Sequence, residues 1–288
     1  MKQKFRNGVV VEKYDGQEKL LTLLYGSAAG RVLLKPLTAP VVSRLGGWFL
    51  STGVSRVLIK PFIRSNGIDM TQFEPVSYRS YNEFFSRKIR PEARSVDMDP
   101  KHLISPCDSK LTALPIGEDT VFTLKHTAYT VSSLLKSDTL AKRYAGGYAL
   151  IFRLTVDDYH RYCYVAEGEK SENTRIPGVL HTVNPIANDH FPIYKENSRE
   201  YSILHTAKFG DILMMEVGAL LVGRIVNHHE AAEVTRGQEK GYFQFGGSTV
   251  VLLTEPGSVI IDEDILHNSR EGTETIVRYG EKIGTAAK

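Results

Sequence analysis

The sequence of 288 residues lacks the features that define several classes of protein. Its two cysteines, Cys107 and Cys163, are too few for a disulfide scaffold and suit a reducing compartment. The chain does not open with the basic, apolar and small-residue regions of a secretory signal, so we expect no secretion. The longest stretch without a charged residue has 14 positions, Gly241 to Thr254, whereas a membrane-spanning helix needs about 20 apolar residues. We therefore expect no transmembrane helix.

The short motifs of common enzyme and binding classes are also missing. The sequence contains no GxxxxGK(S/T), no GxGxxG after a strand, no HExxH, no CxxC and no GxSxG. His228 and His229 are adjacent, and neighbouring residues of a strand point to opposite faces, so we expect no metal site there. The basic N-terminal part lacks an aromatic RNA-binding signature, so we expect no nucleic-acid partner.

Positive charge is concentrated in the first 65 residues. This part holds 11 Lys and Arg against 3 Asp and Glu, although the net charge of the whole chain is only +3. A basic end on a mildly acidic body is typical of a protein that meets an anionic surface. A solvated helical face would show the same pattern.

Residues 18–65 carry leucines at helical spacing, with proline and glycine dividing the segment into short helices. Trp48 and Phe49 stand where an amphipathic helix would place its deepest membrane anchors. We predict that residues 1–75 form an N-terminal helical segment that associates peripherally with the cytoplasmic face of the cell membrane. A helical cap packed on the rest of the protein would give a similar pattern.

From His102 onward the sequence changes to short apolar or alternating runs separated by glycine, proline or Asx residues. Only two helices are expected among these runs, near 130–137 and 139–145. Because regular helical crossovers are missing, we exclude a doubly wound parallel sheet. We predict an α+β fold in which residues 76–288 form a domain with a mixed or antiparallel β-rich core. The expected strands are 102–106, 148–155, 160–165, 201–206, 211–217, 219–226, 241–245, 248–253 and 258–262.

Two consecutive glycines precede Ser248 within one of these runs. A Gly-Gly pair inside a strand normally marks a bulge or a close backbone approach, and this structural interpretation is the commoner one. The functional interpretation is that the Gly247–Ser248 bond is strained and open to attack by the Ser248 hydroxyl. Glycine permits unusual backbone geometry and leaves its own carbonyl unshielded.

Two further polar segments are candidates for chemistry. The first is DDYHRYCY at 157–164, where a strand would place Asp158 and His160 on one face and Cys163 on the other. A lone histidine in a strand is more often structural than catalytic. The second is SPCDSK at 105–110, where a turn would be the ordinary explanation for Asp108.

Taken in order, these segments resemble the phosphatidylserine decarboxylases from about residue 77 to the end of the chain. Each motif is weak alone, but the order and spacing of the set are those of the family. The form GYFQFGGSTV is most similar to the clostridial-type members. The resemblance is carried by SYRSYNEFFSRKIRPEARSVD, SPCD, DDYHR, NPIANDHFPIYKENSRE, FGDILMMEVGALLVGRI and RGQEKGYFQFGGSTV.

The resemblance implies a precursor that cuts itself between Gly247 and Ser248. Ser248 would attack the Gly247 carbonyl to form an ester, and elimination and hydrolysis would leave residue 248 as a pyruvoyl group, the covalent cofactor. This group would form a Schiff base with phosphatidylserine and accept the electron pair released with carbon dioxide, so the product is phosphatidylethanolamine. His160 would protonate the resulting carbon, and Asp108 would orient or polarise the base used in self-cleavage.

Two positions depart from the family pattern: Ser109 replaces the glycine of the usual PxDG, and the more serious departure is at position 163. The family reads DYHRxH, and its second histidine activates the cleaving serine, whereas this chain has Cys163 there. Cys163 could act as a base only as a thiolate, with its pKa lowered from about 8.5 by a cation such as Arg161. His160, His205 and Lys110 are alternatives. We favour His205 over Cys163, because an imidazole with a pKa near 6.5 transfers protons readily at neutral pH.

The resemblance also implies partners and a second hypothesis. The expected partners are phosphatidylserine, an anionic membrane surface, a second copy of the chain in a homodimer, and the cleaved fragments 1–247 and 248–288 held together. The alternative to a carboxy-lyase is a degenerate relative that does not cleave itself and binds anionic phospholipid without turnover. The retained cleavage pair, Asp108 and His160 favour the enzyme, and Cys163 favours the binding protein.

Overall fold

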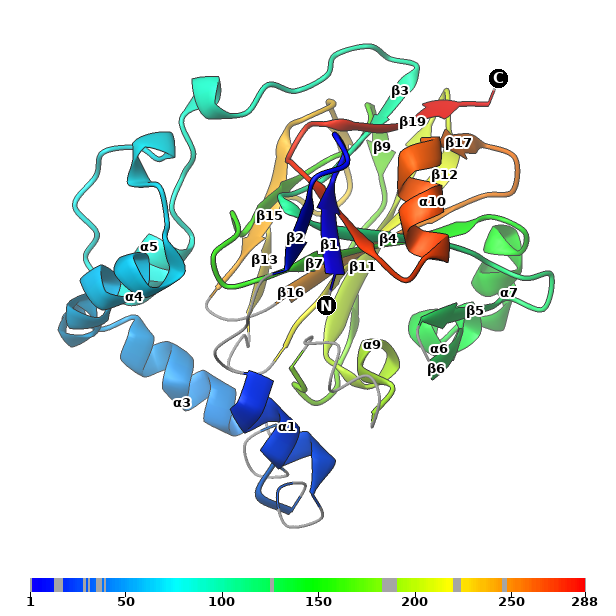
Figure 1. The fold of residues 1–288 in the computed structure, drawn as a ribbon. Helices are drawn as coiled ribbons and strands as arrows, with labels where there is room; N and C mark the ends of the chain where they lie inside the picture. The colour runs from blue at the N-terminus through cyan, green and yellow to red at the C-terminus, as the bar shows by residue number, and fades with distance from the viewer. Residues whose placement is uncertain are drawn as a thin grey trace.

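The structure is a computed structural model with an α+β fold, in which strands form the centre and helices lie around it (Figure 1). This architecture confirms the predicted fold class. Gly247, expected from the sequence to precede the cleavage bond, lies outside the residues that the structure describes. The described residues are 2–12, 18–27, 30, 32–34, 38, 40–124, 127–182, 191–219, 224–244 and 248–287.

A large, mostly antiparallel sheet forms the core. Its central strand β16 is buried over its whole length, as expected for the apolar run that follows Ser248. In spatial order the strands are β14 (Ala232–Val234), β9 (Gly168–Lys170), β11 (Arg199–Thr206), β12 (Gly210–Val217), β16 (Ser248–Thr254), β7 (Tyr148–Leu154), β4 (Ser109–Pro115), β18 (Glu274–Val277), β1 (Lys2–Phe5) and β2 (Val10–Glu12), with β10 (Thr174–Ile176) paired to β11.

Smaller sheets pack around this core. The one that matters for the site combines β13 (Ile225–Asn227), β15 (Glu239–Phe243) and β8 (Arg161–Cys163), and side chains of β13 and β15 contact β12. The others are β17 (Val259–Ile261), β19 (Lys282–Ala286) and β3 (His102–Ile104), and the pair β5 (Val121–Leu124) and β6 (Thr127–Thr130).

The helices are short, and several begin at a capping hydroxyl, such as Ser80 for α5 and Thr130 for α6. The N-terminal helices, coloured blue to cyan in Figure 1, lie outside the sheets. No helix in the described ranges is long and apolar enough to cross a membrane. The helices are α1 (Glu18–Gly26), α3 (Pro40–Leu50), α4 (Ile59–Asn66), α5 (Tyr81–Phe85), α6 (Val131–Leu135), α7 (Asp138–Ala141), α9 (Ile193–Glu196) and α10 (Glu263–Arg270).

The structure corrects two expectations about the fold. Residues 2–12 are not part of a helical segment, because β1 and β2 extend the large sheet through parallel pairing of β1 with β18. The prediction of only two helices after residue 102 is also wrong, since α9 and α10 are present. The helix α10 packs on β4 and β18, where the Ser269 hydroxyl accepts the backbone N–H of Ala113. Such long-range packing stabilises a helix too short to be recognised from propensity.

Candidate active site

Three strand ends meet at one end of the large sheet. Strand β4 begins at Ser109, next to Leu154, the last residue of the antiparallel strand β7. Leu154 in turn pairs with Ser248, the first residue of β16. The segments that carry Asp108 and His160 therefore leave the sheet at the same end as the chain enters β16. This end of the sheet is the candidate active site.

The strands that flank two connections of the chain pair with each other at this end. One joins β7 to β8 and contains His160, and the other joins β15 to β16 and leads to Ser248. The backbone carbonyl of His160 accepts the N–H of Phe243 at 2.9 Å, and β8 pairs with β15. Phe243 and Ser248, the described residues that flank the expected cleavage bond most closely in strands, are thus tied to the two ends of the connection that carries His160.

The hydroxyl of Ser248 is fully buried and has no hydrogen-bond partner among the described residues. Its side chain lies on the same face of the sheet as Glu216, because Glu216 pairs with Val250, two residues further along β16. Glu216 contacts β13 and β15, so this face is the one covered by the small sheet. A buried hydroxyl without a partner costs about 1–3 kcal/mol, and such a group calls for a functional explanation.

His160 is held in one tautomer. Its Nδ1 lies 2.9 Å from the carbonyl oxygen of Asp158, which can only accept, so Nδ1 carries the proton. The ring is fully buried against Phe85, with 4.1 Å between ring centroids. Burial, together with the positive charge of Arg87, lowers the pKa of His160 to about 3. The imidazole is therefore neutral at physiological pH, and Nε2, which has no partner among the described residues, is a free acceptor.

The segment before His160 is a turn, so Asp158 and His160 do not lie on one face of a continuous strand. The carboxylate of Asp158 accepts the N–H of Thr155 at 2.6 Å and pairs with the ammonium of Lys110 at 2.6 Å. Arg87 donates to the carbonyls of Asp157 and Asp158, both at 3.4 Å. The ammonium of Lys110, one of the alternative bases, is thus engaged in an ion pair with Asp158. The turn also holds in place the Asp158 carbonyl that orients His160.

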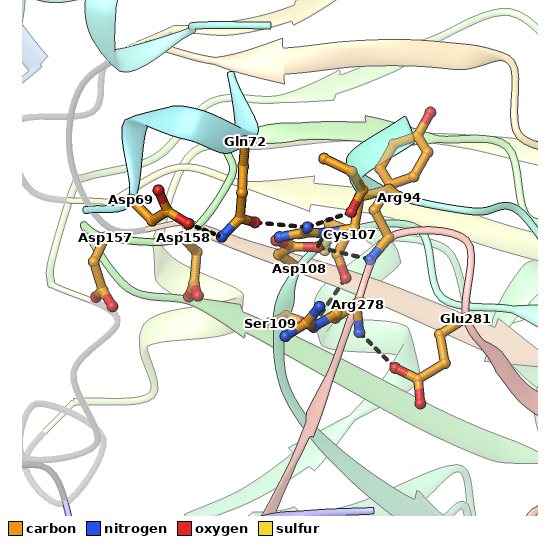
Figure 2. A network of polar contacts seen from close by, with 12 residues as sticks. Asp69, Gln72, Arg94, Cys107, Asp108, Ser109, Asp157, Asp158, Arg278 and Glu281 are labelled. Atoms are coloured by element: carbon orange, nitrogen blue, oxygen red, sulfur yellow. Dashed lines mark hydrogen bonds and ion pairs between the residues drawn. The ribbon is translucent and has the colours of Figure 1, made fainter. Parts of the chain in front are cut away.

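Asp108 is also engaged by a cation. Its carboxylate accepts Nε of Arg94 at 2.9 Å and the N–H of Tyr279 at 2.8 Å. Figure 2 shows Arg94 between Asp108 and Gln72, whose side-chain oxygen accepts Arg94 Nη1 at 2.9 Å. The contacts of Asp108 in the described structure are therefore with Arg94 and Tyr279 and include no histidine, so the predicted base for it to orient is not seen here. Removing one partner of a buried ion pair typically costs about 3–5 kcal/mol.

Cys163 lies close to Asp108 in the fold but is not activated. Its Sγ is 3.9 Å from the carbonyl oxygen of Ser105, and burial raises its pKa to about 12. Arg161, the cation expected to lower this pKa, instead pairs with Glu239 at 2.6 Å. The thiol is therefore neutral at physiological pH, and the structure does not support the alternative in which Arg161 makes Cys163 a thiolate base.

His205 lies at the opposite end of the sheet. It pairs with Asp211 across β11 and β12, and its Nδ1 contacts the Asp211 carboxylate at 2.6 Å in a half-exposed position. Ser248 is next to Thr249, which pairs with Val217 of β12. At about 3.4 Å per residue, the strand from 211 to 217 separates His205 from Ser248 by roughly 20 Å. His205 is too far away to accept a proton from Ser248.

The structure therefore gathers Ser248, His160, Asp108 and Cys163 and leaves His205 out. It adds Arg87 and Arg94, two cations from the segment upstream of the core that hold the turn before His160 and the carboxylate of Asp108. Sequence reasoning missed both. The arginine-rich stretch SRKIRPEAR was the available signal, but the partners lie 14 or more positions away.

A buried serine hydroxyl without a partner and a neutral histidine with a free nitrogen, carried to the same end of a β-rich sheet, are typical of an enzyme site rather than of a surface-binding module. A family model described as phosphatidylserine decarboxylase matches residues 81–285. The chain belongs to the phosphatidylserine decarboxylase family and is a carboxy-lyase, which confirms the resemblance identified in its motifs.

Curated relatives match over almost their full length. A protein of Clostridium acetobutylicum named phosphatidylserine decarboxylase proenzyme 2 is 46% identical over 94% of this chain and 94% of its own. Proteins named phosphatidylserine decarboxylase proenzyme from Clostridium tetani and Ruminiclostridium cellulolyticum are 41% and 40% identical, each over 95% of this chain and 94% of their own. The word proenzyme describes those relatives as precursors.

Proposed function

We propose that the protein decarboxylates phosphatidylserine to phosphatidylethanolamine after breaking its own chain between Gly247 and Ser248. The observation that carries this proposal is the pair of orphan atoms at the site, Ser248 Oγ and His160 Nε2, both buried and both without a partner in the described part of the chain. The test is mass spectrometry of the purified protein together with a lipid assay. It should detect residues 248–288 as a separate chain with a pyruvoyl terminus, and phosphatidylethanolamine as the product.

His160 is the base for self-cleavage in this proposal. Its Nε2 accepts the Ser248 hydroxyl proton as the oxygen attacks the Gly247 carbonyl carbon. The carbon–nitrogen bond then breaks, the same proton passes to the departing nitrogen of residue 248, and an ester joins the two parts. A neutral imidazole is needed for the first transfer, and the carbonyl of Asp158 fixes the required tautomer.

The residues of the site fit a pyruvoyl group at position 248. Position 248 begins a fully buried strand paired on both sides, so a chain end there stays in place after cleavage. When present, the group supplies an electrophilic carbonyl that bonds the substrate amine and takes up the electron pair released with carbon dioxide. His160 lies in the connection that follows β7, the strand whose last residue pairs with position 248, and its Nε2 is free to relay a proton.

The same proposal includes a membrane-facing surface formed by the helical residues 18–65. Arg56, Lys60 and Arg64 are exposed there, and no acidic residue lies between Lys19 and Ile68. Exposed apolar and basic side chains together suit the interface of an anionic bilayer. The exposed apolar residues of this surface are Leu23, Val32, Leu33, Val41, Leu45, Trp48, Phe49, Val54, Val57 and Leu58.

Replacing both Trp48 and Val57 by serine should weaken binding to vesicles that contain anionic lipid. Trp48 is 71% exposed and Val57 73%, so the change removes apolar contact with the bilayer and little internal packing. Binding of the unmodified protein should also weaken as salt rises, since each basic residue contributes about 1 kcal/mol near such a surface. Co-sedimentation with vesicles measures both effects.

Ile260 provides the matched control for this surface. It is 61% exposed on β17, outside residues 18–65, so Ile260→Ser should leave vesicle binding unchanged. Activity on a short-chain soluble substrate should be nearly the same for the double variant and the unmodified protein. Equal losses on bilayers and on soluble substrate would show that the helices are a structural cap.

Cys163→Ala and His205→Ala should both retain self-cleavage within about threefold of the unmodified rate. The thiol is neutral because burial raises the pKa of Cys163 to about 12, and His205 lies at the wrong end of the sheet. Denaturing gel electrophoresis of freshly synthesised protein, sampled over time, gives the rates. Arrest of cleavage by either substitution, in protein that still folds, would assign the base to that residue instead of His160.

A further inference from the structure

A second buried acid lies close to Ser248. On the face of the sheet that carries the Ser248 side chain, Glu216 is opposite Val250 and therefore diagonal to Ser248. Gly218, which follows β12, contributes no side chain between them. Diagonal neighbours across antiparallel strands lie about 7–8 Å apart, within reach of a glutamate side chain. Among the side chains that β12 places on this face, that of Glu216 is therefore the nearest to position 248.

Only one oxygen of the Glu216 carboxylate is used by the protein. Its Oε2 accepts Lys240 Nζ at 2.8 Å and Asn227 Nδ2 at 3.1 Å, and the side chains of Glu216 and Lys240 are both completely buried. Its Oε1 has no hydrogen-bond partner in the parts of the chain that the structure describes. A buried carboxylate oxygen without a donor is costly and indicates a donor that the protein does not itself supply.

The surroundings make this carboxylate a good proton acceptor. Burial raises the pKa of Glu216, and the ammonium of Lys240 opposes that rise without cancelling it. The other ionisable groups that interact with Glu216 lie in β8, just after β8, and in β9, β11 and β15. They are Tyr162, Tyr164, Lys170, Glu200 and Lys240.

We propose that Glu216 Oε1 receives the ammonium group of the phosphatidylserine head and takes one proton from it. An ammonium nitrogen has no lone pair and cannot attack a carbonyl carbon, whereas the amine left after proton transfer can. As the amine adds to the carbonyl carbon, one of its two protons passes to the carbonyl oxygen. The proton held by Glu216 then returns to the same oxygen, which leaves as water when the nitrogen–carbon double bond forms, so protons and charge balance. This role rests on the proposed function, and it is separate from self-cleavage, which uses His160.

The test compares two labelling reactions of the processed protein, read as the mass of the 248–288 chain. One reaction is reductive trapping of short-chain phosphatidylserine with cyanoborohydride, and the other is labelling by phenylhydrazine, whose nucleophilic nitrogen is uncharged at neutral pH. Glu216→Gln should lower the trapping rate at least about 100-fold, the usual size of an acid–base contribution. Phenylhydrazine labelling should stay within about twofold, because it needs no proton acceptor.

Glu200→Gln is the matched control. Glu200 is a buried carboxylate that pairs with Glu216 in the ladder and bonds the same Asn227, but it lies one strand further from Ser248. Both labelling rates should be unchanged in this variant. Equal trapping by Glu216→Gln and the unmodified protein, or an equal loss of trapping and hydrazine labelling, would overturn the proposal.

The unmodified protein gives an independent readout if Glu216→Gln does not fold or cleave. As pH falls, protonation of Glu216 removes the acceptor, so trapping should decline relative to phenylhydrazine labelling. Because burial raises the pKa of Glu216, a ratio that stays constant as the pH is lowered from neutrality would contradict the role of Glu216. Absence of any phenylhydrazine labelling in the unmodified protein would contradict the pyruvoyl group itself, and hence the proposed function.

Discussion

Ser248→Ala should remain a single chain of 288 residues, and its decarboxylase activity should fall to background. Without the hydroxyl no ester can form at the Gly247 carbonyl, so the carbonyl group that the reaction needs is never made. Denaturing electrophoresis reports the missing 248–288 fragment, and conversion of phosphatidylserine to phosphatidylethanolamine reports the activity. A Ser248→Ala protein that still decarboxylates would contradict the proposed mechanism.

The same substitution should not destabilise the fold. The Ser248 hydroxyl is buried without a partner in the described structure, and removing such a group is neutral or stabilising by roughly 1 kcal/mol. Loss of processing in a protein of unchanged or higher Tm would therefore separate chemistry from folding. Thr249→Val is the matched control, because it removes a neighbouring buried hydroxyl that points to the opposite face of the sheet, and it should cleave normally.

An unmodified protein that stays full length after prolonged incubation would favour the alternative function. The chain would then be a binding protein for anionic phospholipid on the same scaffold. Vesicle binding would persist in that case, and Ser248→Ala would have no effect on any measured property. Comparing the unmodified protein with Ser248→Ala therefore distinguishes a self-cleaving enzyme from a non-cleaving binding protein.

The β-rich core could be predicted from sequence because its strands carry their own signals. Residues 148–154 and 248–254 are apolar runs bounded by turn residues, and both are strands of the large sheet. The last two strands of the large sheet, β1 and β2, gave no such signal. Lys2–Phe5 alternates weakly and is held by parallel pairing with residues more than 260 positions away. Helix α10 was missed for the same reason, because its stability comes from packing on β4 and β18.

From the sequence, only the site residues that lie in recognisable motifs could be predicted. Ser248, His160 and Asp108 stand in motifs that resemble a family, and the structure brings them to one end of the sheet. The choice between Cys163 and His205 could not be made from sequence, because it depends on strand register and burial, which are properties of the fold. Glu216 was missed because it looks like one polar residue in an apolar strand, and its partner Lys240 lies 24 positions later.

His160→Asn should slow self-cleavage at least about 100-fold, the usual contribution of a positioned base. The asparagine amide can still donate to the Asp158 carbonyl, as Nδ1 of the histidine does, but it offers no basic nitrogen to Ser248. Circular dichroism should show an intact fold, and the rate of appearance of the 248–288 fragment measures the effect. His205→Asn, the same substitution at the far end of the sheet, should cleave normally.

The pH dependence of the unmodified protein distinguishes His160 from an ordinary histidine base. Because burial lowers the pKa of His160 to about 3, the imidazole stays neutral and able to accept a proton as the pH falls well below neutrality. The cleavage rate should therefore be nearly constant between about pH 8 and pH 5. A base with the ordinary histidine pKa near 6.5 would be about 97% protonated at pH 5, and the rate would fall roughly 30-fold. A fall of that size centred near 6.5, combined with normal cleavage by His160→Asn, would assign the base to another histidine.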